Sequence, residues 1–190
     1  KYQGLLVGTG DLSELCLGWC TFNGDHMASY SVNAGVPKTL VQHLIRWYSR
    51  KHPQLETILT NILSIEISPE LIPPDSSGKI QSTESSVGPY VLNDFFIYHY
   101  LKNRFSSQKI FCLAKHVFGS GEKPDYSPQE IKTWLLKFFQ RFYWSQFKRT
   151  TIPAGPKIGS VSISPRADLR FPNEASVDSL IKQIDRELAL

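Results

Sequence analysis

The sequence predicts an α/β fold that is predominantly helical and contains few strands. An apolar run at residues 5–7 precedes a glycine-rich turn and a helical pattern, which is the order of a strand–turn–helix unit. Helical patterns dominate from residue 38 onward, whereas residues 65–67 and 161–163 alternate like strands but are short. Because a buried parallel sheet needs several strands and covering helices, we expect the chain to be part of a larger α/β domain.

The first predicted elements are a buried strand at residues 5–7, a turn at residues 8–10 and a helix at residues 13–19. This order would aim backbone N–H groups and the positive end of a helix dipole at one point, which suits a phosphate. A glycine turn by itself is weak support for a nucleotide site, so the prediction depends on the residues around it.

Later helices follow from apolar periodicity and from helix-start patterns. Ser127 and Glu130 form a capping-box pattern at the start of an aromatic-rich helix that continues to about residue 147. Residues 73–88 are rich in Pro, Ser and Gly and predict a mobile loop, and residues 150–172, with four prolines, predict irregular structure. The remaining predicted helices cover residues 38–50, 54–61, 89–104, 107–116 and 176–188.

Composition narrows the class of protein. The 190 residues carry a formal charge of +4 that is not clustered into a stripe, which favours anionic small molecules over nucleic acid. No apolar run approaches the ~20 residues of a membrane span. Cys16, Cys20 and Cys112 are odd in number and lack framework spacing, so we expect a reducing, cytoplasmic setting and no zinc site.

Residues 8–38 combine the glycine turn, a helix start, three acids, several aromatics and Lys38. Together with later blocks, this stretch resembles the NAD synthetases of the glutamine-dependent branch, which amidate deamido-NAD at the expense of ATP. The resemblance implies that residues 1–190 are the C-terminal part of a Rossmann-like domain of the ATP pyrophosphatase type. The later blocks are residues 35–40, 68–71, 81–84, 88–90 and 145–149.

Glu14 has two interpretations. A first-turn Glu is stabilised by the helix dipole, and this structural role is the expectation from the residue alone. The family resemblance instead implies a carboxylate that faces deamido-NAD or Mg²⁺, since magnesium takes one or two carboxylates beside phosphate oxygens. The same resemblance implies that Thr9, Lys38 and Ser68 bind ATP. No tightly bound metal is expected, and no catalytic residue is assigned.

The resemblance also implies a deamido-NAD site around residues 19–25 and at Lys148. Aromatic residues at a helix end are more often core residues, and an Asp after Gly is often a turn former, so both structural alternatives remain open. Arg149 is a second cation beside Lys148, and the resemblance implies that it lies near the same ligand. The alternative is that both cations are solvated at a helix end, where positive charge suits the helix dipole. The site residues expected to bind deamido-NAD are Glu14, Trp19, Cys20, Thr21, Phe22, Asp25 and Lys148.

By resemblance, the parent enzyme joins the nicotinate carboxylate to AMP and then replaces AMP with ammonia. The family's pyrophosphate loop, Ser-Gly-Gly-x-Asp-Ser, and its glutaminase domain do not occur in this sequence. We therefore expect the 190-residue chain alone to be inactive, with glutamine reaching the parent through the missing domain. A homo-oligomer is expected. The alternative is a non-catalytic nucleotide-binding or oligomerisation module of the same fold.

Overall fold

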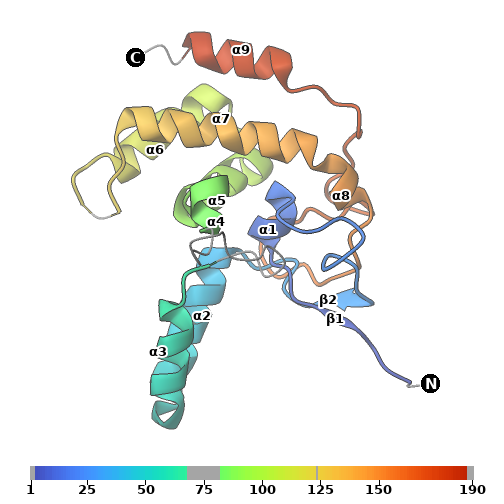
Figure 1. Ribbon diagram of the computed structural model, residues 1–190. Helices are drawn as coiled ribbons and strands as arrows, with labels where there is room; N and C mark the ends of the chain where they lie inside the picture. The colour runs from blue at the N-terminus through green and yellow to red at the C-terminus, as the bar shows by residue number, and fades with distance from the viewer. Residues whose placement is uncertain (1–2, 68–81, 123, 188–190) are drawn as a thin grey trace, which may run out of the picture.

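Helices dominate the computed structural model, which describes residues 3–67, 82–122 and 124–187 (Figure 1). Within this part of the chain, strands β1 (Val7–Gly8) and β2 (Tyr30–Ser31) form a parallel two-stranded sheet in which Val7 pairs with Tyr30. The prediction of a largely helical α/β fold with few strands is therefore confirmed. No helix among the described residues has the length and hydropathy that a membrane span requires.

The core lies between α1 (Leu12–Leu17), α5 (Tyr90–Ile97), α6 (Ser107–Phe118) and the long helix α7 (Pro128–Trp144), with α9 (Asp178–Glu187) packed on the outer side of α7 (Figure 1). The aromatic-rich pattern of α7 explains its place at the centre, because one face is buried along its length. The α7 side chains fully inside the core are Ile131, Leu135, Phe138, Phe139 and Phe142.

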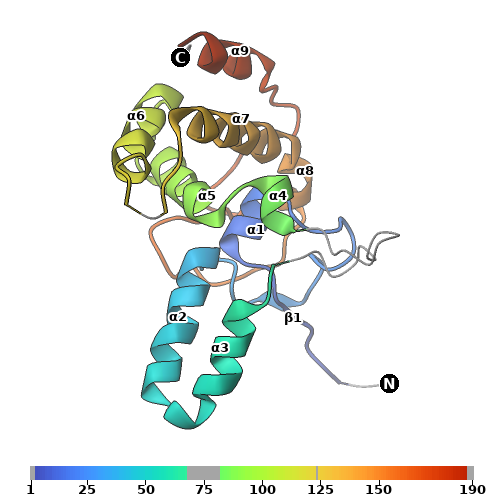
Figure 2. The ribbon, with the colours of Figure 1, turned by 60° about the vertical axis from the view of Figure 1, so that its left-hand side comes forward.

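A helical hairpin projects from this body, as Figures 1 and 2 show. It consists of α2 (Lys38–Lys51), the 3-10 turn η1 (Pro53–Leu55) and α3 (Glu56–Ser64). The predicted apolar face of α2 exists, but Leu40, Leu44 and Trp47 remain substantially exposed. Periodicity predicts which residues share a face and leaves open what covers that face.

The prediction of a buried strand at residues 5–7 is wrong. Leu5 and Leu6 are 69% and 63% exposed, and the strand itself contains only Val7 and Gly8. Within the described chain, β2 is the one strand that pairs with β1, so the two strands form only a minimal sheet. The apolar run predicted that these side chains are buried, but the described residues leave them exposed.

The two short alternating stretches are not strands either. Val161 and Ile163 are buried while Ser162 between them is not. The alternation therefore indicated correctly which side chains are buried, but the segment does not pair into a sheet. Residues 65–67 are irregular. In the predicted loop at 73–88, residues 83–87 form helix α4 (Thr83–Val87), whereas residues 73–81 lie outside the described part.

Helix ends differ from prediction where local geometry decides them. The π-helical turn η2 (Tyr98–Lys102) replaces the end of the helix predicted at 89–104. The helix predicted to reach about residue 147 ends at Trp144 and is followed by α8 (Gln146–Thr150). The capping box at its start is confirmed, because the Ser127 hydroxyl accepts from the Glu130 N–H (3.2 Å) and Glu130 accepts from the Ser127 N–H (2.8 Å).

Candidate functional site

Helix α1 begins at a self-contained cap. The Asp11 side chain accepts a hydrogen bond from the Glu14 N–H (3.0 Å), and the Glu14 carboxylate accepts one from the Asp11 N–H (3.2 Å). The Leu12 N–H donates to the Val36 carbonyl (3.0 Å), which ties the helix start to the segment before α2. These N–H groups are satisfied within the protein, so a phosphate near this turn would depend chiefly on side chains.

Lys38, the first residue of α2, lies between two carboxylates at this cap. Its Nζ is 2.7 Å from Asp11 Oδ2 and 2.7 Å from Glu14 Oε1. Its ammonium also lies 5.6 Å from the centroid of the Tyr90 ring. Glu14 and Lys38, which were predicted as site residues with different ligands, are thus in direct contact.

Asp94 on α5 fixes the start of α2. Pro37 at the N-cap offers no side-chain cap, so the first N–H groups of α2 need other acceptors. Asp94 Oδ2 accepts from the Thr39 N–H (2.9 Å) and from the Thr39 hydroxyl (2.6 Å). The Ser13 hydroxyl accepts from the Lys38 N–H (2.9 Å) and donates to the other Asp94 oxygen. Ser13 and Asp94 therefore hold Lys38 opposite α1.

Burial controls protonation in this cluster. Burial, reinforced by the charge of Glu14, raises the pKa of Asp11 although Lys38 opposes the shift. Burial also raises the pKa of Asp94, while the hydrogen bonds that its carboxylate accepts oppose this shift. For Lys38 burial acts to lower the pKa, but the two adjacent carboxylates outweigh it and the pKa rises. Lys38 thus stays a cation, whereas Asp11 takes up a proton more readily than an exposed Asp.

The other end of α1 is held by groups from α7 and α8. Gly18 ends the helix in the left-handed conformation (φ 62°). Arg149, only 1% exposed, donates to the Cys16 carbonyl (2.6 Å). The Ser145 hydroxyl donates to the Leu17 carbonyl (3.0 Å). Arg149 therefore has a structural role, capping a carbonyl that α1 leaves without a partner.

Lys148 and Arg141 lie at the same helix end but are less buried. Lys148 Nζ donates to the Gly18 carbonyl (2.9 Å) and to the Cys20 carbonyl (2.6 Å). Arg141 Nε donates to the Leu17 carbonyl (3.2 Å). The predicted site residues Cys20 and Lys148 are thereby brought together, beside a cation that was not predicted.

The predicted loop residues have mainly local partners. Asp25 Oδ1 accepts from the Thr21 N–H (2.6 Å), which makes Asp25 a turn-forming residue in this state. The buried His26 ring pairs with the Thr21 carbonyl and with the Thr151 hydroxyl, both at 3.1 Å. Phe22 is exposed and stacks on His26 with 5.3 Å between ring centroids. The loop is thus anchored to the end of α8 through His26.

The remaining predicted residues are distributed as follows. Trp19 and Cys20 are half-buried, and Thr9 is exposed. Burial raises the pKa of the Cys20 thiol, although the nearby Lys148 opposes the shift. Ser68 lies outside the described residues. The structure therefore gathers Glu14 with Lys38 at one end of α1, and Trp19, Cys20 and Lys148 at the other.

Four residues of this region escaped the sequence analysis as site residues: Asp11, Tyr90, Asp94 and Arg141. Asp11 stands three residues before Glu14, a recognisable capping-box pattern that points to a helix start. Tyr90, Asp94 and Arg141 lie in apolar or aromatic helices, where a polar residue has no distinctive spacing. Only the packing of α5 and α7 against α1 shows that they face the site.

Glu14 can bind magnesium only if a bound ligand, such as a phosphate, supplies further oxygen atoms to the ion. Its two carboxylate oxygens are used by Lys38 and by the Asp11 N–H. Across the ranges described, no three acidic, His or Cys side chains gather into a metal site. One carboxylate suffices where phosphate oxygens and water supply the other ligands, so Glu14 fits a magnesium ion that a bound phosphate shares.

Comparison with known proteins identifies the family of the chain. A family model described as NAD synthase matches residues 1–108. Glutamine-dependent NAD(+) synthetases of Mycobacterium leprae and Mycobacterium tuberculosis (strain H37Rv) are each 45% identical to the chain, over 206 and 203 residues, and match 99% and 97% of it. The chain spans 30% of the length of each of these relatives.

A solved structure supports the fold. The crystal structure of a glutamine-dependent NAD(+) synthetase from Cytophaga hutchinsonii matches 96% of this chain and 27% of that chain with a TM-score of 0.70. The sequence identity is 23%, so this likeness concerns the fold alone. Since the family model covers more than half of the sequence, the chain belongs to the NAD synthase family.

Proposed function

We propose that the chain contributes part of the ATP and deamido-NAD site of a glutamine-dependent NAD synthetase, in which the nicotinate carboxylate is converted to an amide through an adenylated intermediate. Residues 1–190 would be the C-terminal portion of the synthase domain. The observation that carries the proposal is the contact of Glu14 and Lys38, whose carboxylate and ammonium lie 2.7 Å apart although 24 residues separate them in the sequence.

The chemistry of each group suits this role. Lys38 supplies a fixed cation for the phosphates of ATP, with Thr9 and Ser68 as further ATP-binding residues. Glu14 would hold Mg²⁺, which when bound supplies positive charge against the phosphate oxygens. Since a phosphate can replace one of the two carboxylates beside Lys38, the ammonium need not lose its counter-charge when ATP binds.

The dinucleotide would lie at the opposite end of α1. Trp19 offers an aromatic face and Lys148 a cation, and both are close to the Cys20 backbone. Thr21, Phe22 and Asp25 form the adjoining loop, whose local hydrogen bonds would be exchanged for contacts with deamido-NAD. The start of α1, with Glu14 and Lys38, and its end, with Trp19 and Lys148, lie along one short helix, so the nicotinate carboxylate of deamido-NAD would extend along α1 toward the α-phosphate of ATP that it attacks.

Self-association is a second proposed property, supported by the projecting hairpin. Leu40, Leu44 and Trp47 on α2 and Ile58 and Ile62 on α3 are exposed apolar side chains. Contiguous apolar surface of this kind commonly marks a contact between proteins. The chain would act in the cytoplasm, where its free cysteines remain reduced.

Isothermal titration of the 190-residue chain with ATP and with deamido-NAD tests the proposal. We expect both nucleotides to bind, Lys38→Met to weaken ATP by about ten-fold or more, and Lys38→Met to leave deamido-NAD affinity nearly unchanged. An assay for NAD with ATP, deamido-NAD and ammonium should give no turnover by the chain alone. Absence of binding of both nucleotides would overturn the proposed function.

A further inference from the structure

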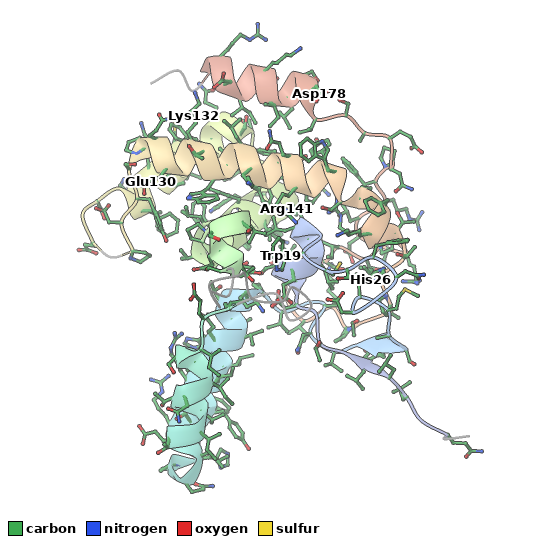
Figure 3. All side chains as sticks on the ribbon, in the orientation of Figure 1. Trp19, His26, Glu130, Lys132, Arg141 and Asp178 are labelled. Carbon is green, nitrogen blue, oxygen red and sulfur yellow. The ribbon has the colours of Figure 1, made fainter. Side chains whose placement is uncertain are left out.

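Arg141 lies on α7 with its guanidinium over the indole of Trp19. The distance from Arg141 Cζ to the ring centroid is 5.0 Å, within the range of a cation–π contact. Figure 3 shows Arg141 and Trp19 together in the region between α7 and α1. One of the five guanidinium N–H groups, on Nε, donates to the Leu17 carbonyl. The described residues accept no hydrogen bond from the two terminal nitrogens.

The charge around Arg141 is unbalanced. Among the described residues no carboxylate forms an ion pair with Arg141, with Lys148 or with Arg149. The carbonyls at the end of a helix offset only about half an elementary charge, and three cations share them here. Burial lowers the pKa of Arg141, which reflects the unfavourable loss of solvent around a cation without a counter-ion.

A second polar group without a partner in the described part of the chain, the Tyr90 hydroxyl, lies near the start of α1. Its side chain is buried and its hydroxyl has no hydrogen-bond partner among the described residues. The ring lies beside the Lys38 ammonium, and Tyr90 begins α5, which packs against both α1 and α7. Arg141 therefore lies in the Trp19–Lys148 cluster, and Tyr90, whose hydroxyl the described residues leave without a partner, lies beside the Glu14–Lys38 cluster.

We infer that Arg141, seated on Trp19, is an oxyanion-binding residue of the dinucleotide site and receives either the nicotinate carboxylate or the diphosphate of deamido-NAD. The inference rests on the proposed function. A guanidinium with two free terminal nitrogens matches the two oxygens of a carboxylate or phosphate. The aromatic face below holds the guanidinium plane in place, and the Leu17 carbonyl fixes its Nε. An incoming anion supplies the counter-charge that the described residues do not provide.

The test compares Arg141→Gln with Ser145→Ala. Both side chains donate to the Leu17 carbonyl, so Ser145→Ala reproduces the loss of that hydrogen bond without removing the charge. Deamido-NAD and NAD are titrated into each 190-residue chain by calorimetry, and thermal melts confirm that each variant is folded. Arg141→Lys is the second variant, which keeps the charge but not the planar pair of donors.

We expect Arg141→Gln to weaken deamido-NAD by at least about ten-fold, Ser145→Ala to change it less than about two-fold, and Arg141→Lys to fall between them. An equal loss for NAD assigns the contact to the diphosphate, and a loss confined to deamido-NAD assigns it to the carboxylate. Equal affinities of Arg141→Gln and Ser145→Ala would overturn the inference while the proposed function stands. A wild-type chain that binds neither nucleotide would overturn both.

Discussion

Replacing Arg149 by Met should destabilise the protein far more than the same change at its neighbour Lys148. Arg149 is 1% exposed, and its guanidinium donates to the carbonyls of Cys16 and Phe142 and to Gln146 Oε1. Lys148 also donates to two carbonyls, but it is only half-buried. The two adjacent cations thus differ mainly in whether water can replace the side chain as hydrogen-bond donor to the backbone carbonyls.

The expected magnitude follows from the acceptors left behind. Each buried acceptor without a partner costs about 1–3 kcal/mol, and Arg149→Met leaves two backbone carbonyls in that state. Removing a buried cation recovers part of the desolvation cost, so we expect a net loss of about 2–4 kcal/mol in the free energy of unfolding. For a chain of this size that corresponds to roughly 4–16 °C in melting temperature. Lys148→Met should cost less than about 1 kcal/mol, because Lys148 is only half-buried and water can take its place beside the Cys20 carbonyl.

Urea unfolding followed by circular dichroism measures both variants, with the slope m checked for each so that midpoints can be converted to free energies. Deamido-NAD titration of the same samples separates stability from binding: Lys148→Met should lose affinity with little loss of stability. Equal midpoints for the two variants would refute the structural role given to Arg149. A strong loss of stability in Lys148→Met would refute the division of roles between the neighbours.

Other predictions concern the acids and the cysteines. Asp94→Asn should lower the free energy of unfolding by about 1–3 kcal/mol in urea melts, because an amide nitrogen would face the Ser13 or Thr39 donors. An unchanged urea midpoint would contradict the capping role of Asp94. Burial raises the pKa of Asp11, so the native state binds this proton more tightly than the unfolded state does. The free energy of unfolding should therefore decline as pH rises above the unfolded pKa of 3.8 and through the raised native pKa. Asp11→Asn, which keeps an N-cap, should reduce that decline between about pH 4 and 7 in urea melts, and parallel pH profiles would argue against it. Iodoacetamide at about pH 8 should modify the exposed Cys112 first and the buried Cys16 only after denaturation, since burial raises the pKa of Cys16 to about 12. Peptide mass spectrometry measures the order of labelling, and early labelling of Cys16 would contradict its place in the core.

Patterns that depend on neighbours in sequence were predictable. The capping box at Ser127 and the apolar face of α7 depend on residues within a few turns, and both are confirmed. Family resemblance named Glu14 and Lys38 as site residues, but it did not predict their direct contact, since 24 residues separate them. Sequence spacing could not indicate that the Lys38 ammonium would pair with Asp11 as well.

Features that depend on packing between distant elements were not predictable. Leu5 and Leu6 have the composition of a buried strand, yet their burial depends on partners that the described chain does not provide. Arg141 has no distinctive position within an aromatic helix, and its importance follows from the approach of α7 to α1. Lys148 and Arg149 are adjacent and chemically alike, but the helix turn leaves Lys148 half-buried and places Arg149 in the core.

Hydrogen exchange of the 190-residue chain, measured by mass spectrometry with and without ATP and deamido-NAD, tests the assignment of the site most directly. We predict slower exchange in peptides that cover α1, residues 18–25 and α8, and unchanged exchange in α9, which lies on the far side of α7. Protection confined to other elements, or no protection at saturating nucleotide, would contradict the placement of ATP and deamido-NAD at the two ends of α1.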